Sequence, residues 1–129
     1  MKSASSPVTR WLAGFQGVYF LATAIWPLVH MPSFIAVTGP KVDLWLVDTV
    51  ALLVGAIGVS LLAASWQQTR IAIETRLLAI LSAAGLAWID FYYTSIGRIW
   101  PVYALDGLAE TALILGWVVV SMRDYKMRV

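Results

Sequence analysis

Four acidic residues lie inside long apolar stretches of the sequence, where charge is tolerated least. They are Asp48, Asp90, Asp106 and Glu110. A charged side chain in a membrane span costs about 2.5–3.5 kcal/mol on insertion scales, so these acids must face a bundle interior, pair with bases, hold protons or contact water. Asp106 and Glu110 are four residues apart and share one helix face, so both should not ionise easily in a poorly hydrated site. Glu110 lies deepest in its stretch. The acids indicate a site for a cation, a proton or an amphiphilic amine.

Three further side chains are predicted to bind a ligand beside these acids: Tyr103, His30 and Trp45. An aromatic face attracts cations, while an interfacial aromatic belt is the alternative role for Tyr103. His30 ends the first apolar stretch, where it could bind a metal, carry a proton or lie solvated at the interface. Trp45 and Tyr103 each precede an aspartate by three residues, which indicates either a repeated helix pair or a chance similarity between apolar segments.

A purely structural role is the alternative for the acid cluster. Arg98 could pair with Asp90, and Lys41 could pair with Asp43 or Asp48. Two bases cannot neutralise the five acids expected in the outer half of the bundle, and ionisable residues inside a membrane are functional by default. The sequence therefore favours a functional cavity.

Several kinds of chemistry lack support. The chain has no cysteine, which excludes disulfides, thiolate catalysis and cysteine-bound metals. Its single histidine allows no His-x-x-x-His spacing and no Glu-x-x-His spacing occurs, so we predict no metal site and no cofactor. Serine hydrolysis has no supporting pattern. The net charge of +2 is too small to predict nucleic-acid binding. We assign no catalytic residue, and the pattern leans away from an enzyme.

Four apolar runs are the elements that would position these residues. The chain has 129 residues, of which 60% are apolar and 12% charged, against about 25% charged residues in soluble domains. A helix crosses a bilayer with about 20 mostly apolar residues. The predicted spans cover residues 11–29, 44–66, 77–96 and 101–122. Soluble core helices would need a polar face, and segments such as LLVGAIGVSLLAA have none. A cleavable signal peptide is the alternative for the first run, which we expect to be a span.

The links between the runs predict the topology. Residues 67–76 and 97–100 are short connections, and residues 30–43 form the longest link, with Asp43 as a plausible cap for the second span. Short links make neighbouring helices antiparallel. We therefore expect an all-α integral membrane protein whose membrane domain, residues 11–122, is an antiparallel four-transmembrane-helix bundle.

The basic residues predict the orientation. Seven of the nine lie on one side of the spans: Lys2, Arg10, Arg70, Arg76, Arg123, Lys126 and Arg128. Lys41 and Arg98 lie on the other side. Because cytoplasmic loops carry an excess of Lys and Arg, both termini are predicted to be cytoplasmic, with a polar tail at residues 1–10 and a basic tail at residues 123–129. The expected location is a bacterial inner membrane, with the acids in the outer half.

Other residues are predicted to pack the bundle. Pairs of small residues four positions apart allow helices to approach closely. They are Ala13 with Gly17, Ala51 with Gly55, and Ala112 with Gly116. Gln16 is expected to make an interhelical hydrogen bond, and the deep tryptophans, Trp88 and Trp117, are expected to pack inside the bundle.

Residues 26–34 (WPLVHMPSF) and 38–47 (TGPKVDLWLV) resemble parts of small, functionally unassigned four-span bacterial membrane proteins, as do the regions around Asp90 and Asp106. That resemblance implies the architecture and no activity. In size and span count the chain is also similar to the EXPERA group, which includes the sigma-2 receptor and emopamil-binding sterol isomerases and uses acids in a bundle cavity. Small multidrug exporters share the size, but their essential glutamate lies in the first span, which has no acid here.

Three functions follow from the sequence as hypotheses. The leading one is a small membrane protein that binds or transports a small cationic or amphiphilic ligand, or protons, through an acidic cavity in the outer half. The second is a membrane-embedded, EXPERA-like isomerase or other lipid-modifying enzyme. The third is a non-catalytic subunit of a membrane complex. The expected partners are membrane lipid, such a ligand, and a homodimer or membrane-protein partner, with no nucleic acid.

Overall fold

The computed structural model describes residues 4–129, which form an all-α chain without a β-strand. Its helices are α1 (Pro7–Val29), α2 (Met31–Thr38), α3 (Leu44–Trp66), α4 (Ile73–Ser95) and α5 (Val102–Lys126). All of them except α2 are long and apolar enough to cross a membrane. The four predicted spans are therefore confirmed as long apolar helices.

Helix α3 has the predicted bounds, whereas the other long helices are longer than expected. Helix α1 begins inside the stretch predicted to be a polar tail, because Pro7 suits a first helical turn and the Ser6 hydroxyl accepts a hydrogen bond from the Thr9 backbone N–H at 3.3 Å. Residues 1–3 of that predicted tail lie outside the described residues. Helix α5 likewise continues through part of the predicted basic tail. Asp43 precedes α3 as predicted, but its side chain makes no capping hydrogen bond.

The link at residues 30–43 contains a helix that the sequence analysis did not predict. His30 ends α1 through its backbone N–H, which donates to the Trp26 carbonyl at 2.9 Å. The same residue begins α2, where its Nδ1 accepts from the Ser33 backbone N–H at 3.2 Å. One residue thus turns the chain from one helix into the next. Its imidazole is engaged at this corner.

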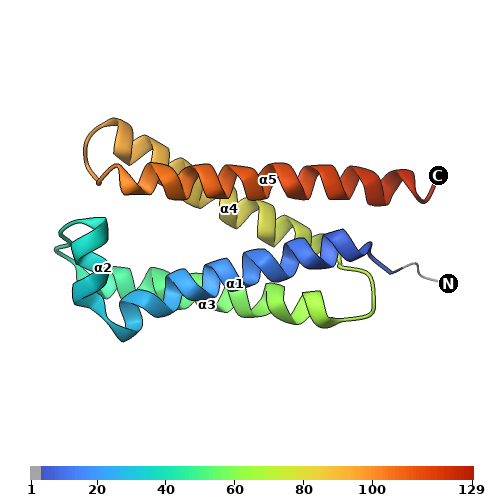
Figure 1. The fold of residues 1–129 in the computed structure, drawn as a ribbon, viewed down its shortest axis with the longest axis horizontal. Coiled ribbons are helices and arrows are strands. Elements are labelled where there is room, and N and C mark those ends of the chain that lie inside the picture. The colour runs from blue at the N-terminus through green and yellow to red at the C-terminus, as the bar shows by residue number, and fades with distance from the viewer. Residues whose placement is uncertain (1–3) are drawn as a thin grey trace.

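The long helices associate as two pairs, α1 with α3 and α4 with α5 (Figure 1). Helix α2 joins the first pair at one end of the molecule, and the chain ends N and C both lie at the opposite end. Gly17 and Gly58 set the distance between α1 and α3. A Cβ on Gly17 would lie 2.8 Å from the Gly58 carbonyl oxygen, and a Cβ on Gly58 would lie 2.9 Å from that of Gly17. The predicted close contact at Gly17 is confirmed.

A buried ion pair lies within the second helix pair near the chain ends, and a hydroxyl of α1 links the first pair to it. The Arg76 guanidinium of α4 lies 2.5 Å from Asp124 Oδ2 of α5, and both side chains are buried. Thr9 of α1 donates its hydroxyl to the same carboxylate oxygen at 3.0 Å. Arg76 also donates to the Ser121 hydroxyl at 2.9 Å. We call Arg76, Asp124, Thr9 and Ser121 the inner cluster.

A second buried polar contact lies next to this cluster. Gln16 of α1 donates to the Ala79 carbonyl of α4 at 3.0 Å and accepts from the Trp117 indole N–H of α5 at 2.6 Å. Three helices are joined through one amide. The predictions for Gln16 and Trp117 are confirmed. The prediction for Trp88 is wrong, because its side chain is 66% exposed and stacks on Tyr92 at the outside of the bundle.

Candidate ligand-binding site

A cavity of about 580 Å³ lies in the half of the molecule that contains α2. All five helices contribute to its wall, and most of the wall is apolar. Polar side chains enter it from three long helices: Tyr19 and Thr23 from α1, Asp90 from α4, and Asp106 and Glu110 from α5. The cavity forms where the two helix pairs separate, because each pair packs well internally and the contacts between the pairs are fewer.

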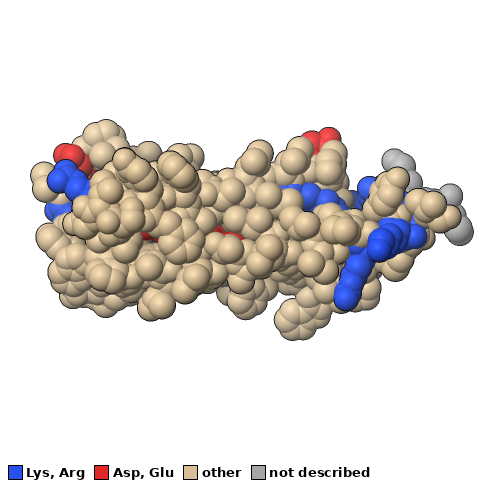
Figure 2. Space-filling model, turned by 90° about the horizontal axis from the view of Figure 1, so that it is seen from above, with Lys and Arg blue, Asp and Glu red and all other residues tan. Residues whose placement is uncertain are grey.

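Three carboxylates lie on this wall, and they come from adjacent helices. Asp90 is 4% exposed and Glu110 is 1% exposed, while Asp106 is half-buried. Asp106 and Glu110 are one turn apart on α5, as the sequence predicted, and the packing of α4 on α5 adds Asp90. In Figure 2, atoms of acidic residues (red) between one end and the middle of the molecule lie recessed among uncharged side chains (tan). We call Asp90, Asp106 and Glu110 the outer cluster.

The hydrogen bonding of the outer cluster is incomplete. The Tyr19 hydroxyl of α1 donates to Asp106 Oδ1. Asp90 Oδ2 and Glu110 Oε2 are buried and have no hydrogen-bond partner among residues 4–129. Buried polar atoms in folded proteins almost always have a partner, so each exception requires an explanation. Both atoms belong to residues on the cavity wall, where a ligand or water would reach them.

Within the described part of the chain, no base forms an ion pair with the outer cluster. The ion pair found among these residues joins Arg76 to Asp124. The structural pairing of Arg98 with Asp90, considered from the sequence, is not formed. Lys41 pairs with no acid either. Its ammonium donates to the Thr38 and Gly39 carbonyls at 3.0 and 2.9 Å.

Lys41 nevertheless borders the cavity. Its Nζ lies 5.2 Å from the centroid of the Tyr103 ring and 5.8 Å from that of Phe34, so it is held at the end of α2 by carbonyls and aromatic faces. This lysine therefore contributes to how α2 is fixed against α5. The Lys41 side chain therefore lines the cavity without forming an ion pair with its carboxylates.

The cavity brings together some of the predicted ligand-binding residues and leaves others out. Tyr103 lines it with the three acids of the outer cluster. Asp48, Trp45 and His30 do not line it. Trp45 is 66% exposed on α3, and the His30 Nδ1 lies 2.8 Å from the Ser33 hydroxyl. The two segments with the similar aromatic-to-aspartate spacing both reach the cavity, but α3 contributes Leu46 and Val47 instead of Trp45 and Asp48.

Sequence reasoning missed Tyr19, Lys41 and the wall that α2 provides. A signal for Tyr19 existed, since a hydroxyl inside an apolar helix requires a partner and an aspartate at similar depth can supply one. The α2 residues gave no comparable signal, because their segment reads as a link with two prolines and a glycine. Phe34 and Thr38 reach the cavity only because the chain folds back over it.

The carboxylates on the wall suit a ligand with a positive group. Within residues 4–129 no group of three His, Cys, Asp or Glu side chains is arranged to hold a metal. Comparisons of this chain with protein-family models, with curated proteins and with solved structures found no match. The geometry alone therefore carries the functional argument. A cavity with an apolar wall and several carboxylates on one side can bind an amphiphilic cation or exchange protons.

Proposed function

We propose that this chain is a four-span, antiparallel protein of a bacterial inner membrane, with both termini cytoplasmic, that binds or transports a small cationic or amphiphilic ligand. The observation that carries the proposal is the outer cluster. Its carboxylates share the wall of one cavity. Among residues 4–129, two of their oxygens are buried without a partner, and no base is bonded to them. A ligand cation would supply the missing positive charge.

The shape and lining of the cavity support a particular ligand chemistry. A compact ammonium group fits beside Asp106 and Glu110, where it replaces water with charged acceptors. Tyr103 adds aromatic wall to the same cavity, and the Lys41 ammonium lies over its ring, 5.2 Å from the centroid. Aliphatic side chains such as Val50 and Ile89 line much of the remaining wall and suit an apolar tail. The ligand class is therefore an amine with an apolar body.

The charge distribution supports the proposed orientation. Blue atoms gather at the end of the molecule where the chain ends lie (Figure 2). The basic residues of that end within the described part are Arg10, Arg70, Arg76, Arg123, Lys126 and Arg128. An excess of this kind is typical of the cytoplasmic side. The outer cluster then lies toward the opposite face.

Binding of an amphiphilic cation to the reconstituted protein tests the proposal. The protein is placed in phosphatidylcholine nanodiscs and titrated with dodecyltrimethylammonium, with tryptophan fluorescence as the readout because Trp26 borders the cavity. We expect saturable binding that Glu110→Gln weakens at least about tenfold, which corresponds to the loss of one buried charge partner. The uncharged analogue dodecanol should bind no better to the original protein than to the variant.

Glu74→Gln is the matched control, because Glu74 is exposed at the start of α4 and lies outside the cavity. It should bind the cation as the original protein does. Equal binding by Glu110→Gln and the original protein would contradict the proposal. So would equal losses in the two variants, because the effect would then be one of general surface charge.

A lipid-modifying enzyme is the second candidate. One observation favours it, namely that acids lie on one side of a cavity whose wall is otherwise mostly apolar, as a lipid substrate would require. An enzyme would change the mass or double-bond position of a membrane lipid during incubation, and Glu110→Gln would abolish that change. Binding of the cation without any altered lipid favours the first candidate. A subunit role, in which the acids meet bases of a partner, requires them at the surface, and Glu110 is 1% exposed.

A further inference from the structure

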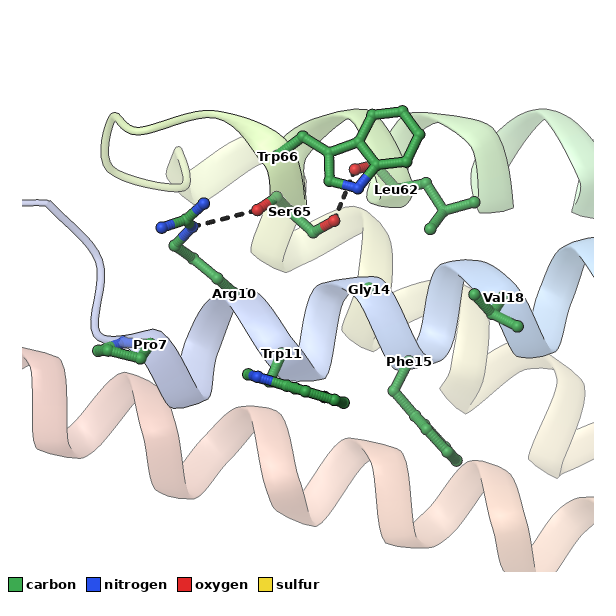
Figure 3. A pocket seen from close by; sticks show the side chains of 9 residues that line it. All are labelled: Pro7, Arg10, Trp11, Gly14, Phe15, Val18, Leu62, Ser65 and Trp66. Atoms are coloured by element: carbon green, nitrogen blue, oxygen red, sulfur yellow. Dashed lines mark hydrogen bonds between the residues drawn. The ribbon is translucent and has the colours of Figure 1, made fainter.

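A second concave surface lies at the other end of the molecule, between α1 and α3 (Figure 3). Its volume is about 520 Å³, and its lining comes from residues 7–18 of α1 and 62–66 of α3, none of which lines the cavity beside the outer cluster. Gly14 forms its floor, since no side chain rises there and an added Cβ would lie 3.4 Å from the Ser65 hydroxyl oxygen. The absence of a side chain at Gly14 opens the groove.

One end of this groove carries an oriented positive charge. Arg10 Nε donates to the Ser65 backbone carbonyl at 3.1 Å, which fixes the guanidinium beside the end of α3 (Figure 3). The two Nη atoms of Arg10 make no hydrogen bond with any residue in the described range 4–129. The Ser65 hydroxyl is itself occupied, because it donates to the Leu62 carbonyl at 2.6 Å. The free donors at this position therefore belong to Arg10.

The remainder of the groove is apolar and open. Trp11 is 79% exposed, Phe15 is 61% exposed and Trp66 is 75% exposed. Tryptophan is enriched at the level of lipid headgroups, and the apolar wall continues from there along α1 to Val18. A cationic end at headgroup depth and an apolar floor below it match the polarity of a membrane lipid.

We propose that this groove is a binding site for an anionic phospholipid, with the phosphate on Arg10 and the start of an acyl chain over Gly14. The guanidinium fork suits phosphate oxygens, and basic pockets beside membrane spans select anionic headgroups. The surrounding charge is favourable as well, because exposed Arg123 and Lys126 belong to the last turns of α5, which end on the same side of the molecule (Figure 1). The site rests on the membrane-spanning helices and is independent of the cation cavity.

Lipid retention measured by native mass spectrometry tests the site. The detergent-solubilised protein is mixed with equal amounts of palmitoyl-oleoyl phosphatidylglycerol and phosphatidylcholine, which share their acyl chains. We expect preferential retention of phosphatidylglycerol. Arg10→Gln keeps a hydrogen-bond donor for Ser65 but removes the charge, and it should reduce that preference about fivefold, the effect of one basic residue at a membrane surface.

A second variant tests the groove by shape instead of charge. Gly14→Leu fills the floor and should reduce the retention of both lipids. Gly85→Leu is its control, because nothing lies within 4 Å of a Cβ at that position of α4. Arg70→Gln is the control for Arg10→Gln, since Arg70 is exposed and does not line the groove. Neither control should change retention, and all variants are first checked for helical content.

Three results would overturn the proposal. One is equal retention of the two lipids by the original protein. Another is an equal effect of Arg70→Gln and Arg10→Gln, which would mean diffuse surface charge. The third is displacement of phosphatidylglycerol by millimolar inorganic phosphate alone, which would mean an anion site without a role for the apolar groove.

Discussion

The two buried polar clusters of this bundle contain similar acids in opposite surroundings. In the inner cluster, Asp124 Oδ2 accepts from Arg76 and Thr9, while its buried Oδ1 has no donor among residues 4–129. In the outer cluster, the buried oxygens Asp90 Oδ2 and Glu110 Oε2 have neither a base nor a hydrogen-bond donor within the described part of the chain. The inner acid is thus explained by its neighbours, whereas the outer acids are next to a cavity.

The difference separates a structural acid from a candidate binding acid. A buried carboxylate beside a guanidinium depends on that partner, and removing either one leaves an uncompensated charge. A carboxylate without a partner gains nothing from its charge in the folded state, so neutralising it should be harmless to folding. Stability and ligand binding should therefore respond in opposite ways at the two clusters.

The largest expected effect on stability is at the ion pair of the inner cluster. Arg76→Met leaves Asp124 buried and unpaired, so it should lower the free energy of unfolding by about 3–5 kcal/mol. Unfolding by sodium dodecyl sulfate in mixed micelles, followed by circular dichroism, measures the loss. The control is Arg70→Met, because Arg70 is exposed in the link between α3 and α4. A loss as small as that of the control would show that the two clusters do not differ.

The next effect is at the close approach of α1 and α3, which positions Thr9 of the inner cluster and Tyr19, the donor to Asp106. Gly17→Ala places a methyl group 2.8 Å from the Gly58 carbonyl oxygen, and such overpacking should cost about 1–3 kcal/mol. Cation binding should weaken with it, because Tyr19 lies on the same helix. Gly85→Ala meets nothing within 4 Å and should leave stability unchanged or raise it by up to about 1 kcal/mol. Identical melting of the two variants would rule out the tight contact.

A smaller effect is expected at the amide beside the inner cluster. Gln16→Met preserves the size of the side chain but leaves the Trp117 indole N–H without its acceptor. Hydrogen bonds between membrane helices contribute about 0.6 kcal/mol on average and at most about 1.7 kcal/mol, so a loss in this range is expected in the same unfolding assay. Gln67→Met, in an exposed position after α3, should show none. A loss at Gln67 of similar size would mean that the assay reports polarity and not this contact.

The smallest effect on stability is expected where the effect on binding is largest. Glu110→Gln should change the free energy of unfolding by less than about 1 kcal/mol, because it leaves no base unpaired. Its weakened binding of dodecyltrimethylammonium then separates function from folding. A loss comparable to that of Arg76→Met would assign Glu110 a structural role and remove the contrast between the clusters.

Local sequence patterns predicted the long helices well and the site only in part. The bounds of α3 and the roles of Gln16, Gly17 and Trp117 were predictable, because a long apolar run, a lone amide and a pair of small residues each have few solutions in a bundle. The exposed position of the Trp88 side chain was not predictable, because the sequence position of a residue in a span indicates its depth but not the direction in which its side chain faces. Pairings such as Arg98 with Asp90 failed for the same reason, because proximity along the chain does not orient two side chains.

The sequence by itself determined that this chain is helical, apolar enough to span a membrane four times, and basic at one end and acidic toward the other. These are properties of composition and spacing, and they hold in any packing of the helices. Only the tertiary structure decided that Asp90 joins Asp106 and Glu110 while Asp48 lies apart, and that α2 closes over them. The rotation of each helix about its axis settles these points, and it depends on contacts between residues far apart in the chain.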